Sequence, residues 1–594
     1  MPRWIQGKTK IKMRPELELV LCAARARSPQ NDARIHALLN ENLNWSEVLA
    51  SAHEHKLGPL LDERLRALDA SWPHQDERQR LASLARDFAK SNMAYTGEML
   101  RLCSIFESAR IPAIPFKGPV LAWLAYSNFA LRSCVDLDFV LPQREIPQAK
   151  SLLEAHGYTP QFNDIEAQAG QRGPAPGQYA FVSSGRRMFV ELHTERTLRY
   201  FSCPLDLDEM NPRLIRFKIG GQTVPSFSVE DQLVMLSVHG AKHFWDRLGW
   251  IVDIAQLLSV REVNWPLLFE IAEKMQSTRL LLLGLYLANR VVGAPLPQSV
   301  LEQARNDARI RWLAGRVIEQ YVGNLDSSRG VWPRALFRFR SSDRFWPGLR
   351  QLFRLTMSPT ETDRQTVQLP GFLAPFYSIV RPFRLLGEYG LGLKRRWKPD
   401  LAIYQPTPKD IVDSMLSLAG ISAGDILYDL GCGDGRIVMA AAEKYGIRAV
   451  GVDINPRRIA EARANARRHG VEGRVNFILG DAQKLDLKEA TVVMMYLSAG
   501  GNLRLVDHLR SQLRPGARIV SRDFKIYGWE PERSENLITA RGAPTSLYLW
   551  TNKNSAREAL QSTNAPPETP QANPSNLREG EEIEGRPTVW QQEK

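Results

Sequence analysis

The stretch ILYDLGCGDGRIVMAAA, Ile426–Ala442, combines an apolar run, three closely spaced glycines and a helix-like continuation. A strand followed by a glycine loop and the start of a helix is typical of a cofactor-binding α/β domain. A dinucleotide-binding G-x-G-x-x-G loop needs its third glycine at the position where this chain has Arg436. Because the acid Asp429 precedes the loop, the pattern favours a ligand with a cationic group over one held by its pyrophosphate.

Strand-like and helix-like segments alternate from 424 to 527, which predicts a parallel α/β sheet. Two strand candidates after the loop end near acids: RAVGVDINP at Asp453 and RVNFILGDAQ at Asp481. A carboxylate at the first position can accept both ribose hydroxyls, and one at the second can accept an adenine amino hydrogen. ATVVMMYL and ARIVSRDF are predicted as the fourth and fifth strands.

This ordered set resembles the class I S-adenosylmethionine-dependent methyltransferases over residues 400–553. The segment YQPTPKDIVDSMLSLAGISAGDILYDLGCGDGRIV, with ATVVMMYL and SRDF, is similar to the small protein-lysine methyltransferase family that includes the ATP-synthase c-subunit enzyme. The resemblance implies a Rossmann-like α/β domain with a mostly parallel seven-stranded sheet, S-adenosylmethionine as cofactor, and an amine acceptor on a protein or small molecule. It assigns cofactor binding to Tyr404, Thr407, Asp429, Gly431, Gly433, Gly435, Asp453 and Asp481.

Tyr496 and Asp523 are the candidate catalytic residues on the acceptor side. In-line attack by a neutral amine mainly needs positioning and a way for the amine to shed its proton. Many enzymes that methylate nucleic-acid amino groups carry an Asn-Pro-Pro-Tyr type turn where this chain has Met495–Ser498, which disfavours a base-methylating function. The alternatives are a core aromatic for Tyr496 and a loop cap for Asp523.

A second constellation lies in FKGPVLAWLAYSNFALRSCVDLDFVLP, residues 116–142, where Asp136 and Asp138 alternate with apolar residues. Residues two apart on a strand point to the same side. Two such carboxylates repel each other unless a cation lies between them. Mg²⁺ ions bound there can hold a nucleotide triphosphate. Glu191 in MFVELH is the candidate for the third metal ligand, and Asp136, Asp138 and Glu191 are the candidate catalytic residues. The alternative is a DxD pair on an exposed turn.

This part resembles the DNA-polymerase-β-like nucleotidyltransferases, in a little-characterised bacterial branch, over residues 21–390. The resemblance implies an α+β fold with a helical extension. The candidate nucleotide-binding residues are Lys117, Gly118, Arg132 and Lys242. Pro119 and Glu191 depart from the family pattern, which has a small residue and an aspartate at these positions.

His239 and His243 lie four residues apart on one face of a predicted helix. That spacing suits zinc, but position 240 is glycine and lacks the glutamate of an HExxH motif. The alternative is a pair of histidines that pack or line a cleft.

The net charge is +13, from 78 basic and 65 acidic residues, which permits nucleic acid, nucleotide or acidic-lipid partners. The 5 cysteines are scattered and form no CxxC pair, so neither a disulfide framework nor a structural zinc site is expected. No apolar run reaches about 18 residues, and the basic N-terminus lacks the apolar core of a signal peptide. A cytoplasmic bacterial protein without a transmembrane segment is expected.

The two resemblances imply a nucleotidyltransferase-like part at 21–390 and a methyltransferase-like part at 400–553. A flexible N-terminus is expected at 1–20, and the composition of 554–594 predicts a disordered tail. The segment 329–398 is rich in Arg and aromatics and is either a solvated connector or a nucleic-acid or lipid surface. Three functions remain open. Both sites are active, or only methyl transfer is and the N-terminal part binds the substrate, or the chain modifies RNA or a small molecule.

Overall fold

The computed structural model describes most of the chain outside the N-terminal and C-terminal segments. The disordered tail predicted for 554–594 and most of the basic segment 329–398 lie outside the described residues. The described ranges are 13–68, 75–161, 177–183, 188–194, 206–322, 331–346, 348–349, 353, 357, 376–385, 401–402, 404–540 and 544–553.

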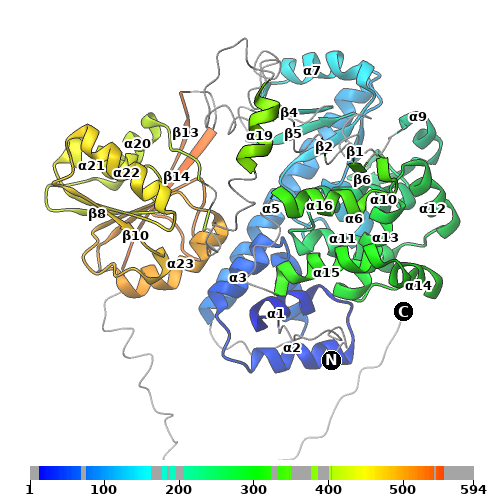
Figure 1. Cartoon of the computed structure of the whole chain (residues 1–594), viewed down its shortest axis with the longest axis horizontal. Helices are drawn as coiled ribbons and strands as arrows, with labels where there is room; N and C mark the ends of the chain where they lie inside the picture. Colours follow the sequence, from blue (N-terminus) through cyan, green and yellow to red (C-terminus); the bar gives the residue numbers. More distant parts are fainter. Residues whose placement is uncertain are drawn as a thin grey trace, which may run out of the picture. The chain divides into compact units, whose positions relative to one another are not determined.

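Helices dominate the N-terminal part. The first helix begins at Pro15, inside the segment predicted to be flexible, because Leu19 and Val20 are fully buried against neighbouring helices. The longest, α5, spans 34 residues. The helices of this part are α1 (Pro15–Ala24), α2 (Pro29–Leu39), α3 (Trp45–Glu54), α4 (Gly58–Ala67), α5 (Gln75–Ser108), α6 (Gly118–Tyr126), α7 (Ile146–Ala155), α9 (Leu207–Met210), α10 (Val229–Lys242), α11 (Leu248–Val260), α12 (Trp265–Lys274), α13 (Thr278–Leu287), α14 (Gln298–Asn306), α15 (Ala308–Val322), α16 (Val331–Ser341) and α19 (Tyr377–Leu385) (Figure 1).

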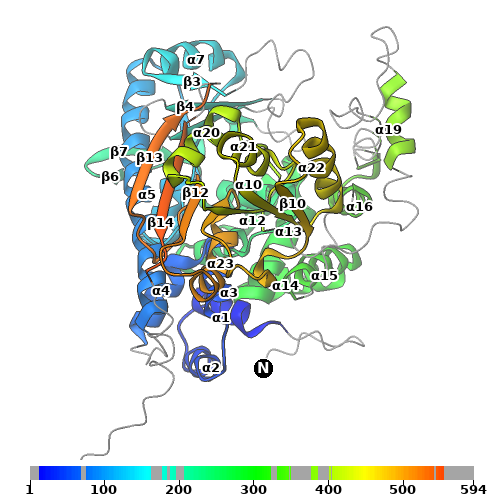
Figure 2. The same ribbon diagram turned by 90° about the vertical axis from the view of Figure 1, so that its left-hand side faces the viewer.

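A mixed sheet lies within this helical part, in the order β1-β2-β5-β4-β3. Strand β2 pairs in parallel with β5 and antiparallel with β1, and β4 pairs antiparallel with both β5 and β3. A separate hairpin pairs β6 with β7 (Figure 2). The strands are β1 (Ile114–Phe116), β2 (Leu137–Val140), β3 (Tyr158–Pro160), β4 (Gln178–Ser183), β5 (Phe189–His193), β6 (Ile215–Ile219) and β7 (Gln222–Ser226).

The C-terminal part holds a seven-stranded sheet in the order β10-β9-β8-β11-β12-β14-β13. Strands β10, β9, β8, β11 and β12 pair in parallel, which confirms the predicted mostly parallel sheet, and β14 and β13 pair antiparallel. Figure 2 shows β12, β14 and β13 side by side. The elements are α20 (Lys409–Ala419), β8 (Ile426–Leu430), α21 (Arg436–Tyr445), β9 (Arg448–Asp453), α22 (Pro456–His469), β10 (Val475–Leu479), β11 (Val492–Met495), α23 (Ala499–Gln512), β12 (Arg518–Arg522), β13 (Arg533–Ile538) and β14 (Pro544–Thr551).

Helices cover both faces of this sheet. Alternate strand residues point to opposite faces, so Leu427 joins a core with α20, α21 and α22, whereas Tyr428 and Leu430 join a core with α23. Figure 1 shows the same division, with α20, α21 and α22 on one side of the sheet and α23 on the other. The three layers leave the carboxyl ends of the parallel strands as the open edge.

No helix among the described residues is both long enough and apolar enough to cross a membrane.

Candidate functional site

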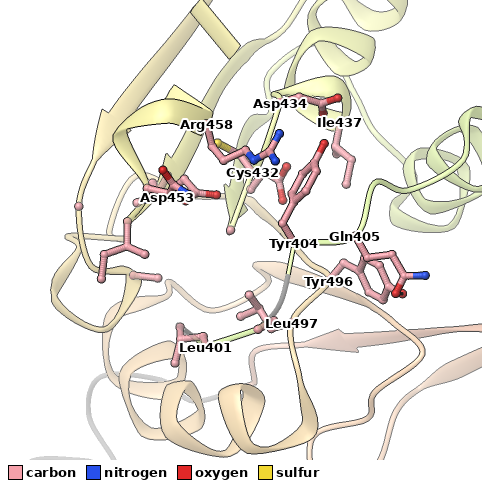
Figure 3. A pocket seen from close by; sticks show the side chains of 18 of the residues that line it. Leu401, Tyr404, Gln405, Cys432, Asp434, Ile437, Asp453, Arg458, Tyr496 and Leu497 are labelled. Carbon is pink, nitrogen blue, oxygen red and sulfur yellow. Dashed lines mark hydrogen bonds between the residues drawn. The ribbon is translucent and has the colours of Figure 1, made fainter. Parts of the chain in front are cut away.

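A cavity of about 470 Å³ opens at the carboxyl ends of β8, β9 and β11. From β8 the chain passes to β9 and β10 on one side, and then crosses to β11 and β12 on the other. Such a reversal of strand order leaves a crevice outside the strand ends. Figure 3 shows its side chains converging from the strand ends and from the segment around Tyr404.

Asp429 lies at the floor of this cavity and is only 3% exposed. Among the described residues, its Oδ2 has no hydrogen-bond partner. Burial, with smaller contributions from the carboxylates of Asp453 and Asp434, raises the pKa of Asp429 to about 8. A buried acceptor that is left without a donor is costly, so this atom fits a ligand that brings its own positive charge and N–H group.

The glycine loop after β8 is fastened to the end of β9. The backbone N–H groups of Gly431 and Cys432 donate to the Val452 carbonyl, at 2.8 and 3.0 Å. The N–H of Gly433 donates to Asp453 Oδ2 at 3.0 Å, and that of Asn455 donates to Asp453 Oδ1 at 2.8 Å. The Asp453 carboxylate is therefore held in one orientation at the cavity wall, with lone pairs left for ligand hydroxyls.

The segment before α20 lies over the loop. The Tyr404 ring stands against Gly433, where an added Cβ would come 2.3 Å from Tyr404 Cε2. The Arg458 guanidinium lies 3.7 Å from the centre of the same ring (Figure 3). Arg436, which replaces the third glycine of a dinucleotide loop, donates to the Thr407 carbonyl at 2.7 Å. The departure from G-x-G-x-x-G thus ties the covering segment to the loop.

We expect Gly433→Ala to weaken S-adenosylhomocysteine binding about tenfold, or about 1.4 kcal/mol. The new methyl group would displace the Tyr404 ring from the cavity, and the backbone φ of +56° disfavours a side chain as well. Gly470→Ala is the matched control, because Gly470 has a φ of +66° but nothing within 4 Å of an added Cβ. Calorimetry should show weaker binding for the first variant only; equal affinities would contradict the covering role of Tyr404.

Tyr496 lies at the mouth of the cavity, directly after β11. Its hydroxyl donates to Gln405 Oε1 at 3.2 Å, and the Arg522 guanidinium lies 4.2 Å from its ring centre. Burial raises the pKa of Tyr496, so the hydroxyl stays protonated near neutral pH. Asp523 lies outside the cavity wall and accepts hydrogen bonds from Thr545 Oγ1 at 2.7 Å and the Ser546 N–H at 3.1 Å.

Most residues predicted to bind the cofactor come together. Gly433 lies behind Tyr404 and Gly435 packs against Phe477, so neither forms the cavity wall. Arg458 and Gln405 were not predicted; Gln405 adjoins the predicted Tyr404, whereas Arg458 follows no recognisable spacing. The predicted residues that line the cavity are Tyr404, Thr407, Asp429, Gly431, Asp453 and Asp481.

The N-terminal part holds two adjoining cavities of about 220 and 200 Å³. Both are lined by Asp136, Asp138 and Lys117. Lys117 Nζ lies 3.4 Å from Asp138 Oδ2. Burial and the neighbouring Asp138 raise the pKa of Asp136 to about 6. The residues predicted for this site that line at least one of the cavities are Lys117, Gly118, Arg132, Asp136, Asp138, Glu191 and Lys242.

Two predicted features have partners inside the protein. Arg132 donates to both carboxylate oxygens of Asp253, at 2.9 and 3.0 Å, and so is held at the cavity wall. The rings of His239 and His243 contact each other at a tilt of 56°, with ring centres 4.7 Å apart, and both contact Trp250. Burial lowers the pKa of both histidines, so both imidazoles are neutral where they line the cavity. These contacts are those of histidines that pack and line a cleft.

Asp138, Glu191 and His193 have ligand atoms within 4.8 Å of one another and form the group suited to a metal among the described residues. His193 was not among the predicted residues, and Asp136, which was, does not belong to this group. The same-face rule that joined Asp136 to Asp138 also applies to Glu191 and His193, which are two apart on β5.

Known proteins match the two parts separately. Residues 41–293 match the family described as uncharacterised nucleotidyltransferase, and residues 429–533 match the ANTKMT methyltransferase domain. A protein-lysine N-methyltransferase from Saccharolobus islandicus is 48% identical over 130 residues, covering 22% of this chain and 81% of that protein. The human ATP-synthase c-subunit lysine N-methyltransferase is 30% identical over 175 residues, covering 30% of this chain and 69% of that protein. A solved RNA methyltransferase from Salinibacter ruber, in complex with S-adenosyl-L-homocysteine, is 44% identical over 25% of this chain and 95% of that chain, with a TM-score of 0.24.

The sheet, the acids at its strand ends and these relatives define an S-adenosylmethionine-dependent methyltransferase. The chain belongs, through its C-terminal part, to the family of small protein-lysine methyltransferases, and its N-terminal part carries a nucleotidyltransferase-family domain.

Proposed function

We propose that this enzyme transfers the methyl group of S-adenosylmethionine to a lysine side chain of a protein. The observation that carries the proposal is the 48% identity to a protein-lysine N-methyltransferase over 81% of that relative. The cavity supports it, because the Tyr496 hydroxyl and the Gln405 amide, which line it, can orient an amine.

Bound S-adenosylmethionine supplies a methyl group on a positively charged sulfur. Asp429 would hold its ammonium group, Asp453 its ribose hydroxyls and Asp481 its adenine amino group, while Tyr404 covers the loop. Tyr496 donates its proton to Gln405, so the lone pairs of its oxygen remain to accept an N–H from the incoming amine. Partial burial at the mouth favours the neutral form of the lysine, which is the form able to attack.

Labelled S-adenosylmethionine, incubated with the purified chain and a cell lysate, tests the acceptor. We expect label in protein, located as methyl-lysine by mass spectrometry after digestion. Label in RNA or in a small molecule would exclude lysine as the acceptor and support the alternatives.

We expect Tyr496→Phe to lower kcat about fivefold, the equivalent of one hydrogen bond of about 1 kcal/mol. The ring and its contact with Arg522 remain, so binding of S-adenosylhomocysteine should change little. Tyr445→Phe, on α21 outside the cavity, is the matched control. Equal kcat values for the two variants would exclude a contact between the Tyr496 hydroxyl and the acceptor amine.

We also propose a nucleotidyl transfer at the N-terminal cavities, from a nucleotide triphosphate and with a divalent cation, for which Mg²⁺ is the expectation from sequence. The family match over 41–293 supports this function, as does the meeting of Lys117 and Lys242 with the acids at one cavity. Lysines there can neutralise phosphate charge while the acids hold the cation.

Labelled nucleotide triphosphates with the same lysate test this second function. Asp138→Asn should abolish incorporation of nucleotide label and leave incorporation of methyl label unchanged. Absence of nucleotide label with the parent chain would leave the N-terminal part as a substrate-binding module.

A further inference from the structure

Exposed large apolar side chains are concentrated in one stretch of the N-terminal part. Of the 16 such side chains among the described residues, 8 lie between Leu336 and Phe383. Apolar residues that are exposed singly are ordinary on a protein surface, whereas exposed apolar residues that gather on one element mark a contact surface. This stretch therefore differs from the rest of the described surface.

Helix α19 turns its apolar side outward. Phe376, Ile379 and Phe383 follow one another at intervals of three and four residues, so they share one helical face. They are 53%, 54% and 70% exposed, whereas Arg381 on the same helix is 8% exposed. A surface helix normally buries its apolar side and exposes its charges. The opposite arrangement leaves an apolar face of α19 for contact with something outside the protein.

The residues directly after α16 repeat this arrangement. Phe345, Trp346 and Leu349 are 58%, 74% and 37% exposed, and their helical spacing places them on one face. The Phe345 and Trp346 rings contact each other edge to face, with centres 5.5 Å apart. Helix α16 itself is held by a contact with α15, because the Arg340 guanidinium lies 4.2 Å from the centre of the Trp312 ring. The second apolar face therefore follows a helix that is packed on its neighbour.

The same stretch is strongly basic. From 331 to 385 the sequence has 9 arginines, no lysine and 3 acidic residues, which is a net charge of +6 out of +13 for the whole chain. Arg344, next to Phe345, is exposed. Arginines beside exposed aromatic and aliphatic side chains are typical of helices that lie in the interface of an anionic bilayer. The aliphatic Leu349 and Ile379 disfavour single-stranded nucleic acid as the partner, because its bases stack on aromatic rings.

We propose that these two apolar faces bind the surface of a membrane that contains anionic lipid. The aromatic and aliphatic side chains enter the boundary between headgroups and acyl chains, and the arginines beside them contact lipid phosphates. Both kinds of contact are needed, since a basic segment alone is attracted to the surface but inserts nothing. The proposal is independent of the two transfer reactions, because it concerns only the contact of the chain with a bilayer.

Flotation of the full-length chain with lipid vesicles tests the proposal. We expect the chain to float with vesicles of phosphatidylcholine and phosphatidylglycerol in equal parts, and to bind vesicles of phosphatidylcholine alone at least about tenfold more weakly. Trp346→Ala and Phe383→Ala change no charge, and each should weaken binding to the mixed vesicles at least about fivefold, because each removes apolar surface from the bilayer. Met93→Ala is the matched control, because Met93 is 63% exposed on α5, and it should bind as the parent does.

A second pair of variants tests the charge. Arg344→Gln should weaken binding to the mixed vesicles about fivefold, because one positive charge leaves the surface contact. Arg467→Gln changes an exposed arginine on α22 and should bind as the parent does. Binding of the parent should persist in part at about 1 M salt, since apolar contacts are not screened.

Three results would overturn the proposal. Equal binding by Trp346→Ala, Phe383→Ala and the parent, or complete loss of parent binding in high salt, would mean that only the general attraction of a basic chain is at work. Absence of flotation of the parent would exclude the membrane as the partner. A dimer of the parent that Trp346→Ala converts to a monomer in light scattering would assign the face to a second copy of the chain. Circular dichroism melting checks that each variant folds, and the parent measurements decide the question if one does not.

Discussion

Replacing Asp453 by alanine is expected to weaken the binding of S-adenosylhomocysteine by about 10²–10⁴-fold. The loss corresponds to two hydrogen bonds from ribose hydroxyls to a charged acceptor, at about 1.5–3 kcal/mol each. The substitution also leaves the N–H groups of Gly433 and Asn455 without their acceptor, so the loop loses its fastening to β9. Both effects act on the same cavity wall.

Isothermal calorimetry of the full chain measures this effect. Asp453→Asn keeps one oxygen acceptor and should fall between the parent and the alanine variant. Asp486→Ala is the matched control, because the Asp486 side chain is 69% exposed and lies outside the cavity. A decrease of less than about threefold for Asp453→Ala, or about 0.6 kcal/mol, would exclude the proposed ribose contact.

The parallel strands of the C-terminal sheet and their acids were predictable because each signal is local. A buried parallel strand is a short apolar run, and its ligand-binding residues follow at its carboxyl end. Asp429, Asp453 and Asp481 all occupy such positions. The resemblance implied seven strands, but β13 was not located in the sequence, because RSENLI is mostly polar and lies at the edge of the sheet, where β14 is its partner.

Contacts between distant segments set the limit of prediction from sequence. The contact of the Arg458 guanidinium with the Tyr404 ring joins residues 54 positions apart, and no rule of sequence spacing predicts it. The bond of Tyr496 to Gln405 joins residues 91 positions apart. By contrast, the hairpin of β6 and β7 turns at Gly220 and Gly221, a two-glycine signal that was present in the sequence.

We expect the affinity for S-adenosylhomocysteine to rise on the order of tenfold per pH unit between about pH 5.5 and 7. Burial raises the pKa of Asp429 to about 8, so the free chain carries a proton there at neutral pH. The ammonium group of the ligand requires the ionised carboxylate, so binding releases that proton and is favoured as pH rises. The range stops at pH 7 because α-amino groups lose their own proton near about 7.7–8.0.

The stability of the ligand-free chain should change with pH in the direction opposite to the ligand affinity. A carboxyl whose pKa is higher in the folded than in the unfolded state stabilises the fold while it is protonated. That contribution is lost as pH rises from the unfolded value of 3.8 towards about 8. The free chain should therefore melt at a lower temperature as pH rises through this window, and saturating ligand should reduce the decrease.

Asp429→Asn separates this effect from the nearby acids Asp453 and Asp434, which remain in the variant. It should bind S-adenosylhomocysteine more weakly than the parent at pH 7 and with a much smaller pH slope. Calorimetry at pH 7 in two buffers of different ionisation enthalpy should show about one proton released by the parent and almost none by the variant. Equal proton release would mean that another group titrates, and Asp429 would then no longer be the residue that meets the positive end of the cofactor.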